Sequence, residues 1–364
     1  MTNATNSGIM KEKNKRLIIN LIRKNPISRA DIAKQTNLTK ASVSIITDDL
    51  IKNGVITEGN SDEKGVGRKP INLKINPSFM YALGVNLTRS YAEIGIVDIT
   101  GKIICQQKLD VYPKNKAIQN IIDSVNKMIL NNGFDFDLIY GIGVTAPGPV
   151  DSVNTTILNP VGFDEWHYEN IGLRLKNAFN KNVFLENVSG GLALCEKYFG
   201  IGKDLNDFLL LKISDGIGAG IISGNKLLKN ASEFGHTSID YNGILCKCGN
   251  RGCVERYAAI PEILKDTNYD NWKQVADNCD EKLIKKEADY LSCAIINAVN
   301  LFGFESIILD GEVNYNPEKL IDYIKKNLKN NTIAKQLPKI TSGSAFSEIT
   351  CAAISVFDNY FNEF

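Results

Sequence analysis

The sequence predicts an α/β protein with a small, mainly helical domain at its N-terminus and a larger body of two similar α/β lobes. Three observations lead to this prediction. Helical periodicity dominates the first fifty residues, and strand-like alternation takes over from Tyr81. One succession of strands and helices is then completed before residue 200 and begins again near residue 207. A chain of 364 residues is also long enough for two or three domains.

The composition is that of an ordinary globular protein, with 43% hydrophobic and 23% charged residues. No run of about 18 apolar residues occurs, so we expect no membrane-spanning helix. The first residues, MTNATNSGIMKEKNKR, lack the apolar core of a signal peptide, which predicts a cytoplasmic protein. In that reducing compartment the eight cysteines should be thiols or metal ligands. The five isolated ones are expected to be buried: Cys105, Cys195, Cys279, Cys293 and Cys351.

The net charge of +1 hides an uneven distribution along the chain. Residues 1–80 carry 14 Lys and Arg against seven Asp and Glu, whereas the remaining residues carry 28 against 34. A basic block on a mildly acidic body suggests a module that binds a polyanion, joined to a domain with another task. Solvated lysines alone would also produce such a bias.

The order of elements in the first eighty residues predicts a winged helix-turn-helix domain over residues 1–78. A helical face in residues 14–25 is followed by Ser28, a good N-cap for a second helix. Thr39 can cap a third helix, which Gly54 ends, and two strand-like stretches then form a hairpin. The alternative is a three-helix module that binds another protein.

In this arrangement the third helix would lie in the major groove of double-stranded DNA. Its outward residues are small or basic, which permits close approach to the bases and contacts to phosphate. The polar stretch between the two hairpin strands places basic residues beside glycines, as a minor-groove contact requires. The predicted DNA-binding residues are Thr39, Lys40, Ala41, Ser42, Ser44, Arg68 and Lys69.

The body, residues 79–364, is predicted to fold as two lobes around a cleft. Successive strands with tight turns at Thr88–Arg89 and Thr100–Gly101 are followed by a helix, and a strand then leads into the glycine- and proline-rich stretch TAPGPVD. We expect the first lobe to comprise roughly residues 79–190 plus the C-terminal helix. The second lobe would comprise roughly residues 191–340.

Three cysteines and one of the two histidines lie within a stretch of 21 residues. Cys246, Cys248 and Cys253 follow His236 by ten, twelve and seventeen residues. One imidazole and three thiolates form a closed tetrahedral set, which is typical of a structural zinc site. A redox pair is a weaker interpretation, because CxC is not the CxxC spacing of thiol oxidoreductases, and coincidence is the third.

Five motifs make the whole chain resemble the ROK family, which contains sugar kinases and sugar-responsive repressors. They are TAPGPVD at 145–151, LEN at 185–187, DGIGAG at 215–220, SEFGH at 232–236 and CKCGNRGCVE at 246–255. The resemblance implies an actin-like, hexokinase-like body with the ribonuclease H-like fold. It also implies Zn²⁺ on the His-Cys-Cys-Cys set, as a structural metal.

The same resemblance implies which side chains contact a sugar. Carboxylates and an imidazole can exchange hydrogen bonds with adjacent ring hydroxyls, and a metal on one nitrogen of His236 would fix the tautomer of the other. The implied sugar-binding residues are Asn159, Asn187, Glu233, His236 and Glu255. Asn159 is the weakest of these, because the family usually has a Pro-Asn order and a shorter gap to the following tryptophan.

Departures from the kinase pattern predict a protein that is not an enzyme. Val188 follows Asn187 where kinases of the family have an aspartate, and valine cannot accept a proton from a sugar hydroxyl. Asn86 stands where those kinases have an acid that holds magnesium, and Asp310 stands where they usually have a glycine. Phosphoryl transfer needs a base, positioned phosphates and a metal, so neither activity nor bound ATP is expected.

The sequence therefore predicts a transcriptional repressor whose kinase-like body binds a sugar without phosphorylating it. Its expected partners are operator DNA, a small sugar effector and further copies of the chain in a homodimer or homotetramer, since paired winged helices read palindromic sites. Two alternatives remain. One is a sugar kinase with a fused regulatory head, and the other is a repressor controlled by a protein partner.

Overall fold

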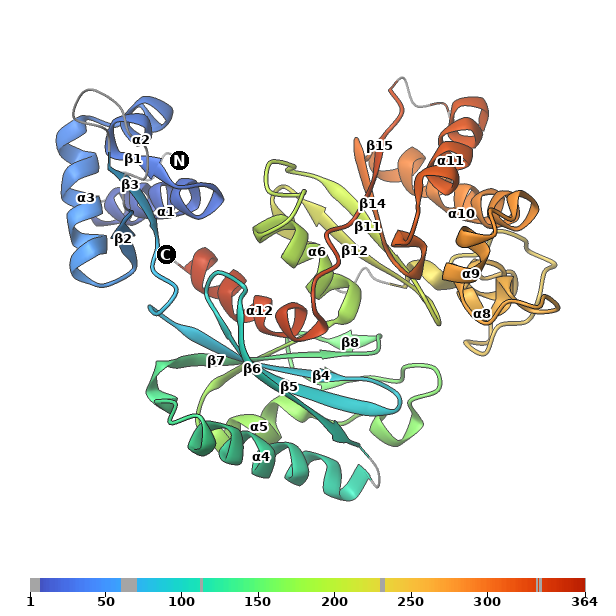
Figure 1. Ribbon diagram of the computed structural model, residues 1–364, viewed down its shortest axis with the longest axis horizontal. Coiled ribbons are helices and arrows are strands. Elements are labelled where there is room, and N and C mark those ends of the chain that lie inside the picture. The colour runs from blue at the N-terminus through green and yellow to red at the C-terminus, as the bar shows by residue number, and fades with distance from the viewer. Residues whose placement is uncertain are drawn as a thin grey trace, which may run out of the picture.

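The computed structural model describes residues 7–59, 71–111, 114–229, 233–331, 333 and 336–363. Three bodies are visible in Figure 1: an N-terminal head and two lobes, each built on its own sheet. Within the described residues no helix combines the length and apolar character needed to cross a membrane.

The head is a three-helix domain with a small sheet, as predicted. Ser28 caps the second helix by accepting a hydrogen bond from the Asp31 N–H, and Thr39 caps the third by accepting one from the Ser42 N–H. The sheet order is β1-β3-β2, so the chain just before the second helix adds a short strand that the sequence did not predict. The head consists of α1 (Ser7–Lys24), β1 (Ile27–Ser28), α2 (Arg29–Thr36), α3 (Lys40–Lys52), β2 (Ile56–Glu58) and β3 (Asn72–Ile75).

The first lobe has a five-stranded sheet of order β10-β7-β4-β5-β6, with α4 and α5 on the face away from the second lobe (Figure 1). Tight turns join β4 to β5 and β5 to β6, at the predicted places. Its elements are β4 (Tyr81–Leu87), β5 (Tyr91–Asp98), β6 (Ile103–Asp110), α4 (Lys114–Asn131), η1 (Phe136–Leu138), β7 (Ile139–Ala146), β8 (Val150–Asp151), β9 (Thr156–Ile157), η2 (Asp164–Trp166), α5 (Ile171–Phe179) and β10 (Asn182–Asn187).

The second lobe has a five-stranded sheet of order β13-β12-β11-β14-β15. Its helices cover the outer face and surround an apolar core with Trp272 and Leu291 fully buried. Its elements are β11 (Phe208–Ile213), β12 (Ile217–Ser223), β13 (Lys226–Leu227), η3 (Phe234–His236), α7 (Glu255–Ala258), α8 (Ile260–Ile263), α9 (Trp272–Asp277), α10 (Glu281–Phe302), β14 (Ser306–Gly311), η4 (Glu312–Asn314), α11 (Glu318–Asn331) and β15 (Lys339–Ser342).

The two sheets share one topology. In each, the first strand pairs antiparallel with the second and parallel with the fourth, and the fourth pairs parallel with the fifth. The succession of strands and helices predicted to recur near residue 207 therefore recurs as a repeated fold. Parallel strands end on the same edge of a sheet, so the loops after β4, β7, β11 and β14 meet where the two lobes face each other.

Two helices, α6 (Val188–Tyr198) and α12 (Glu348–Glu363), lie between the two sheets. α12 packs on the strands of the first lobe and α6 on β12 of the second. Glycines permit this close packing: a methyl group at Gly191 would lie 2.5 Å from the carbonyl oxygen of Cys351, and one at Gly84 would lie 2.7 Å from that of Ile349. Close approach of this kind leaves little room for one helix to move without the other.

The expectation for the isolated cysteines is partly wrong. Cys195 and Cys351 are buried where α6 and α12 meet, and Cys105 is half-buried on β6, but Cys279 and Cys293 are exposed. Cys293 lies on α10, whose buried face is set by its larger apolar residues, so the small thiol falls on the outer face.

Candidate functional site

The predicted DNA-binding residues of the head that the structure describes lie at the start of α3. Thr39, Lys40 and Ala41 are exposed, while Ser42 and Ser44 are half-buried. The hydroxyls of Thr39 and Ser42 lie 2.9 Å apart, so the cap fixes both side chains at the helix N-terminus. The predicted residues Arg68 and Lys69 lie outside the described residues.

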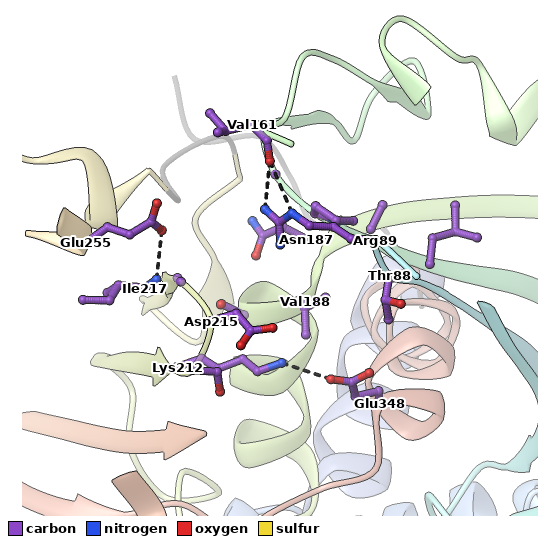
Figure 2. Close-up of a pocket in the computed structure, with 18 of the residues that line it drawn as sticks. Thr88, Arg89, Val161, Asn187, Val188, Lys212, Asp215, Ile217, Glu255 and Glu348 are labelled. Carbon is purple, nitrogen blue, oxygen red and sulfur yellow. Dashed lines mark hydrogen bonds and ion pairs between the residues drawn. The ribbon is translucent and has the colours of Figure 1, made fainter. Parts of the chain in front are cut away.

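A cavity of about 460 Å³ opens between the two lobes (Figure 2). Four of the five predicted sugar-binding residues line it: Asn187 from the first lobe, and Glu233, His236 and Glu255 from the second. Asn159 is exposed and is not among the lining residues, whereas Val161, two residues further on, is. The structure thus brings together residues that are up to 68 positions apart (187 to 255) and leaves the weakest candidate outside.

Asn187 lies at the junction of β10 and α6 and serves as the N-cap of that helix. Its Oδ1 accepts a hydrogen bond of 2.8 Å from the Gly190 N–H, which satisfies a donor at the helix start. The amide is thereby oriented: its Nδ2 donates one hydrogen to Glu186 Oε1 at 3.5 Å, and the second hydrogen can be donated to a ligand. Beside it, burial raises the pKa of Glu186, although the Asn187 N–H donates to that carboxylate.

Glu255 begins α7 and faces the cavity from the second lobe (Figure 2). Its Oε2 accepts a hydrogen bond of 3.0 Å from the Ile217 N–H. A methyl group at Gly216 would lie 2.7 Å from the same oxygen, so the glycine permits the carboxylate to approach the strand turn. One carboxylate oxygen is fixed in this way, and the other can accept from a ligand hydroxyl.

His236 connects the cavity to the cysteine cluster. Its Nδ1 lies 3.7 Å from the Sγ of Cys246, and its Nε2 lies 4.0 Å from the Oε2 of Glu233. The two ring nitrogens therefore face different neighbours, one the sulfur atoms and one a carboxylate that lines the cavity. A metal on Nδ1 would leave Nε2 as a donor on the cavity side.

The ligand atoms of His236, Cys246, Cys248 and Cys253 all lie within 4.8 Å of one another. The Sγ atoms of Cys248 and Cys253 are 3.6 Å apart, close to the roughly 3.8 Å between two sulfurs that share a tetrahedral zinc ion. Gly249 and Gly252 have φ values of +94° and +70°, and a methyl group at Gly252 would collide with the carbonyl oxygen of Asp240. These glycines make the turns that bring the ligands together.

The pKa values of the three thiols are shifted in different directions, raised for Cys246 and Cys253 and lowered for Cys248. Burial raises the pKa of Cys246, and burial together with hydrogen bonds among the thiols raises the pKa of Cys253 to about 12. Several thiols that share a small space cannot all ionise without a cation to offset the charge, whereas a bound metal removes their protons. The residues present fit a divalent metal with soft sulfur ligands.

A polar network crosses the cleft beside these residues. The Nδ2 of Asn86, on β4, donates to Glu348 Oε2 at 2.6 Å, and the Lys212 ammonium, on β11, lies 3.0 Å from Glu348 Oε1. The Thr145 hydroxyl donates to Asn86 Oδ1 at 2.9 Å. Figure 2 shows Lys212 and Glu348 facing each other, so one ion pair links the second lobe to the first residue of α12.

Most of the charged residues of the cavity were not among the predicted site residues. The signal for Asp215 was present in the motif DGIGAG and that for Arg89 in the predicted turn, but nothing near Lys212 or Glu348 in the sequence marks either as part of a site. Five carboxylates, two cations and one imidazole line the cavity, which makes it acidic. The charged lining residues are Arg89, Lys212, Asp215, Glu233, Glu255, Glu312 and Glu348.

Fold and site together define a class of protein: a two-lobed, actin-like and hexokinase-like body with a polar cleft, joined to a winged helix-turn-helix head. Residues 82–344 match the ROK family, and residues 11–57 match a family described as winged helix-turn-helix DNA-binding. The chain belongs to the ROK family.

Relatives of known name support the same grouping. The chain is 28% identical to the xylose repressor of Caldicellulosiruptor bescii, with 91% of each chain covered. It is 30% identical to the DNA-binding transcriptional dual regulator NagC of Escherichia coli, over 88% of this chain and 85% of that protein.

Solved structures share the fold along the chain. A ROK family transcriptional regulator, a homologue of the Escherichia coli MLC protein, superposes with a TM-score of 0.79 at 25% identity over 97% of both chains. A ROK hexokinase from Thermus thermophilus superposes with a TM-score of 0.63 at 23% identity, over 77% of this chain and 99% of that one. The 23% of this chain that the hexokinase does not cover is close to the length of the N-terminal head.

Proposed function

We propose that the chain is a DNA-binding transcriptional repressor whose ROK body binds a sugar and does not phosphorylate it. The observation that carries the proposal is the combination of a winged helix-turn-helix head with a ROK body, over most of the length of relatives named as a xylose repressor and as a DNA-binding transcriptional dual regulator. The chain is a regulator rather than an enzyme, as those relatives are.

The chemistry of the cavity supports sugar binding without catalysis. Val188 lines the cavity beside Asn187 and offers no oxygen to take a proton from a hydroxyl. Asn86 carries no charge, and both ends of its amide are engaged, with Glu348 and with Thr145. Five carboxylates around the cavity also repel the phosphates of ATP, whereas uncharged sugar hydroxyls can donate to them.

In this proposal Asn187, Glu233, His236 and Glu255 bind the sugar from both lobes. Thr39, Lys40, Ala41, Ser42 and Ser44 contact the DNA at the N-terminus of α3, and Arg68 and Lys69 contact it from the hairpin. Two heads of a homo-oligomer would read two half-sites. Sedimentation of the purified chain, alone and with DNA, tests this last point.

We also propose that His236, Cys246, Cys248 and Cys253 hold a structural zinc ion. All four positions would be filled by protein ligands, so the metal would have no open position for a water molecule. Its task would be to fix the segment between His236 and Glu255, and thereby both of those side chains at the cavity.

The experiment that tests the main proposal uses duplex DNA selected from a random pool by the full-length chain. We expect an enriched palindromic sequence, and a dissociation constant for it that changes on addition of D-xylose, N-acetylglucosamine or D-glucose. Lys40→Ala should weaken binding and lower the slope of log K against log salt by about one per contacting chain. Lys285→Ala, which removes the same charge from the body, should leave both unchanged.

Each other outcome points to a different function. Consumption of ATP with magnesium and one of these sugars would overturn the assignment as a non-enzyme. Enriched DNA whose affinity no sugar changes would argue for control by a protein partner. No enriched DNA would remove the repressor function.

A further inference from the structure

The two central helices connect the cavity to the head. At their N-termini, Asn187 caps α6, and Val188 and Ser189 line the cavity. Glu348, the first residue of α12, lines the same cavity and carries the ion pair to Lys212. At about 1.5 Å per residue the helices extend roughly 16 and 24 Å from there. Figure 1 shows that the C-terminal end of α12 lies beside the head.

The C-terminal ends of both helices meet the head at one residue of α1. The Arg23 guanidinium lies 4.2 Å from the ring centroid of Tyr198, the last residue of α6, and 5.6 Å from that of Phe361 on α12. The two rings stack, with centroids 5.5 Å apart and an interplanar angle of 18°. The Tyr198 hydroxyl donates to Asp358 Oδ1 at 2.7 Å, so the two helix ends are also joined to each other.

This junction of Arg23, Tyr198, Asp358 and Phe361 is a poor place for a charge. Burial lowers the pKa of Arg23, and its buried Nη1 has no hydrogen-bond partner among the described residues. Burial also raises the pKa of Asp358. A cation held mainly by aromatic faces contributes about 0.5–2 kcal/mol to the docked arrangement, and that contribution depends on the distance between the guanidinium and the rings.

The helices themselves can carry a movement from the cavity to this junction. A methyl group at Gly191 would press on the carbonyl of Cys351, so α6 and α12 are in direct backbone contact near their cavity ends. A methyl group at Gly218 would lie 2.2 Å from Ser189 Oγ, and one at Gly220 would lie 2.3 Å from the Ser189 carbonyl oxygen. The cavity end of α6 is therefore packed against β12 of the second lobe. Because α6 is packed on β12 as well as on α12, a change in the angle between the lobes would move these two helices together relative to α1.

We propose that the junction of Arg23 with Tyr198 and Phe361 transmits the state of the cavity to the DNA-binding head. The inference rests on the proposed function and names the contact through which that function is regulated. Tyr198 and Phe361 sit at the far ends of the helices whose first residues line the cavity. A ligand that alters the lobe angle would move the two rings, and with them the position in which α1 is held.

The test uses the full-length chain, its selected DNA, and D-xylose, N-acetylglucosamine or D-glucose. It measures the coupling ratio, which is the dissociation constant for the DNA with sugar divided by the dissociation constant without sugar. Arg23→Met and Tyr198→Phe should each reduce this ratio to within about twofold of unity, from the 5- to 150-fold range usual for coupled sites. Affinity for the sugar in the absence of DNA should stay unchanged. Lys24→Met is the matched control, because the neighbouring Lys24 pairs with the exposed Asp204 at 2.9 Å and touches neither ring; it should keep the wild-type ratio.

The outcomes separate the two proposals. A coupled wild-type chain whose Arg23→Met and Tyr198→Phe variants remain coupled overturns the junction and leaves the repressor in place. A wild-type chain whose selected DNA binds with the same affinity with or without sugar overturns both the junction and the sugar response of the proposed repressor. Equal loss in Lys24→Met would show that any contact between head and body suffices, which also overturns the junction. Hydrogen exchange of the wild-type chain needs no variant: the sugar should change exchange in α1, and an unchanged α1 contradicts the proposal.

Discussion

At the scale of single residues, neighbours fix the orientation of the polar side chains that line the cavity. Asn187 uses its oxygen as a helix cap, and Glu255 uses one oxygen on the Ile217 N–H. His236 directs one nitrogen to a thiol and the other toward Glu233. Each side chain is therefore oriented before a ligand arrives, which lowers the entropy cost of binding.

Replacement of one cysteine tests the metal site. Cys253→Ser should lower the affinity for zinc by more than about 100-fold. Replacing a residue that only hydrogen-bonds to a metal ligand costs about 10- to 100-fold, and replacing the ligand itself should cost more. Metal content after dialysis against a chelator, measured by mass spectrometry, gives the result. The exposed, isolated Cys279→Ser is the control and should keep its metal. Full metal in the Cys253 variant would contradict the proposed ligand set.

A buried lysine predicts a dependence of stability on pH. Burial, together with the charges of Lys24 and Arg23, lowers the pKa of Lys197 from 10.5 to about 8. Between these values the unfolded chain holds a proton that the folded chain has released, so the free energy of unfolding should rise with pH. The difference between wild type and Lys197→Met should therefore grow from about pH 8 to pH 10.5.

Chemical unfolding across this pH range measures that difference. Lys285→Met, at an exposed position, is the control and should show a constant difference from wild type. A constant difference for Lys197→Met as well would mean that the lysine titrates alike in both states. The hydrogen bonds from its Nζ to Leu205 O and to Asn225 Oδ1 would then stabilise the protonated lysine enough to offset the effect of burial on its pKa.

At the scale of elements, the repeated sheet topology explains where the site forms. The strands that end at the cleft are the parallel ones of each lobe. α6, which follows β10, and α12, which follows β15, begin there. α6 and α12 then fill the space between the sheets. Gly84 and Gly143 on the strands and Gly191 on α6 have no side chain, so the backbone of α12 can approach them closely.

Adding one methyl group tests that packing. Gly191→Ala would press on the Cys351 carbonyl and should destabilise the chain by about 1–3 kcal/mol, the usual cost of overpacking. Thermal unfolding measures the effect. Gly190→Ala on the same helix meets the Glu186 side chain rather than a backbone, so its cost should be smaller. Equal melting temperatures for wild type and Gly191→Ala would show that α6 and α12 can separate freely.

At the scale of the whole molecule, the head, the central helices and both lobes form a connected structure. Apolar residues of α1, α6 and α12 belong to one continuous core, so the head does not pack as an isolated domain. The Lys212–Glu348 pair then joins the lobes at the other end of α12.

Breaking this pair should loosen the two lobes. Lys212→Met is expected to cost about 1–2 kcal/mol, because the two side chains are only 23% and 32% exposed and hydrogen-bonded as a charged pair. The melting temperature measures the cost. Lys285→Met breaks an exposed pair with Asp289 and should cost no more than about 0.5 kcal/mol. A loss of equal size in both variants would mean that the inter-lobe pair is no stronger than a surface pair.

Much of the fold could be predicted because its signals are local. The caps at Ser28 and Thr39, the turns of the first lobe and the ligand spacing after His236 each involve residues close in sequence, and each is found where expected. The short strand β1 was missed because two residues carry no periodicity, and the outward direction of Cys293 depends on which face of α10 meets its neighbours.

The sequence by itself determined the class of head, the repeated lobes and the cluster of one histidine and three cysteines, since these follow from periodicity, capping and spacing. Only the tertiary structure decided which charges meet in the cavity and which helices lead from it to the head. Glu348 lies 136 residues from Lys212 and 262 from Asn86, and Arg23 lies at the other end of the chain from Phe361. Contacts at such separations arise from packing, which no local pattern encodes.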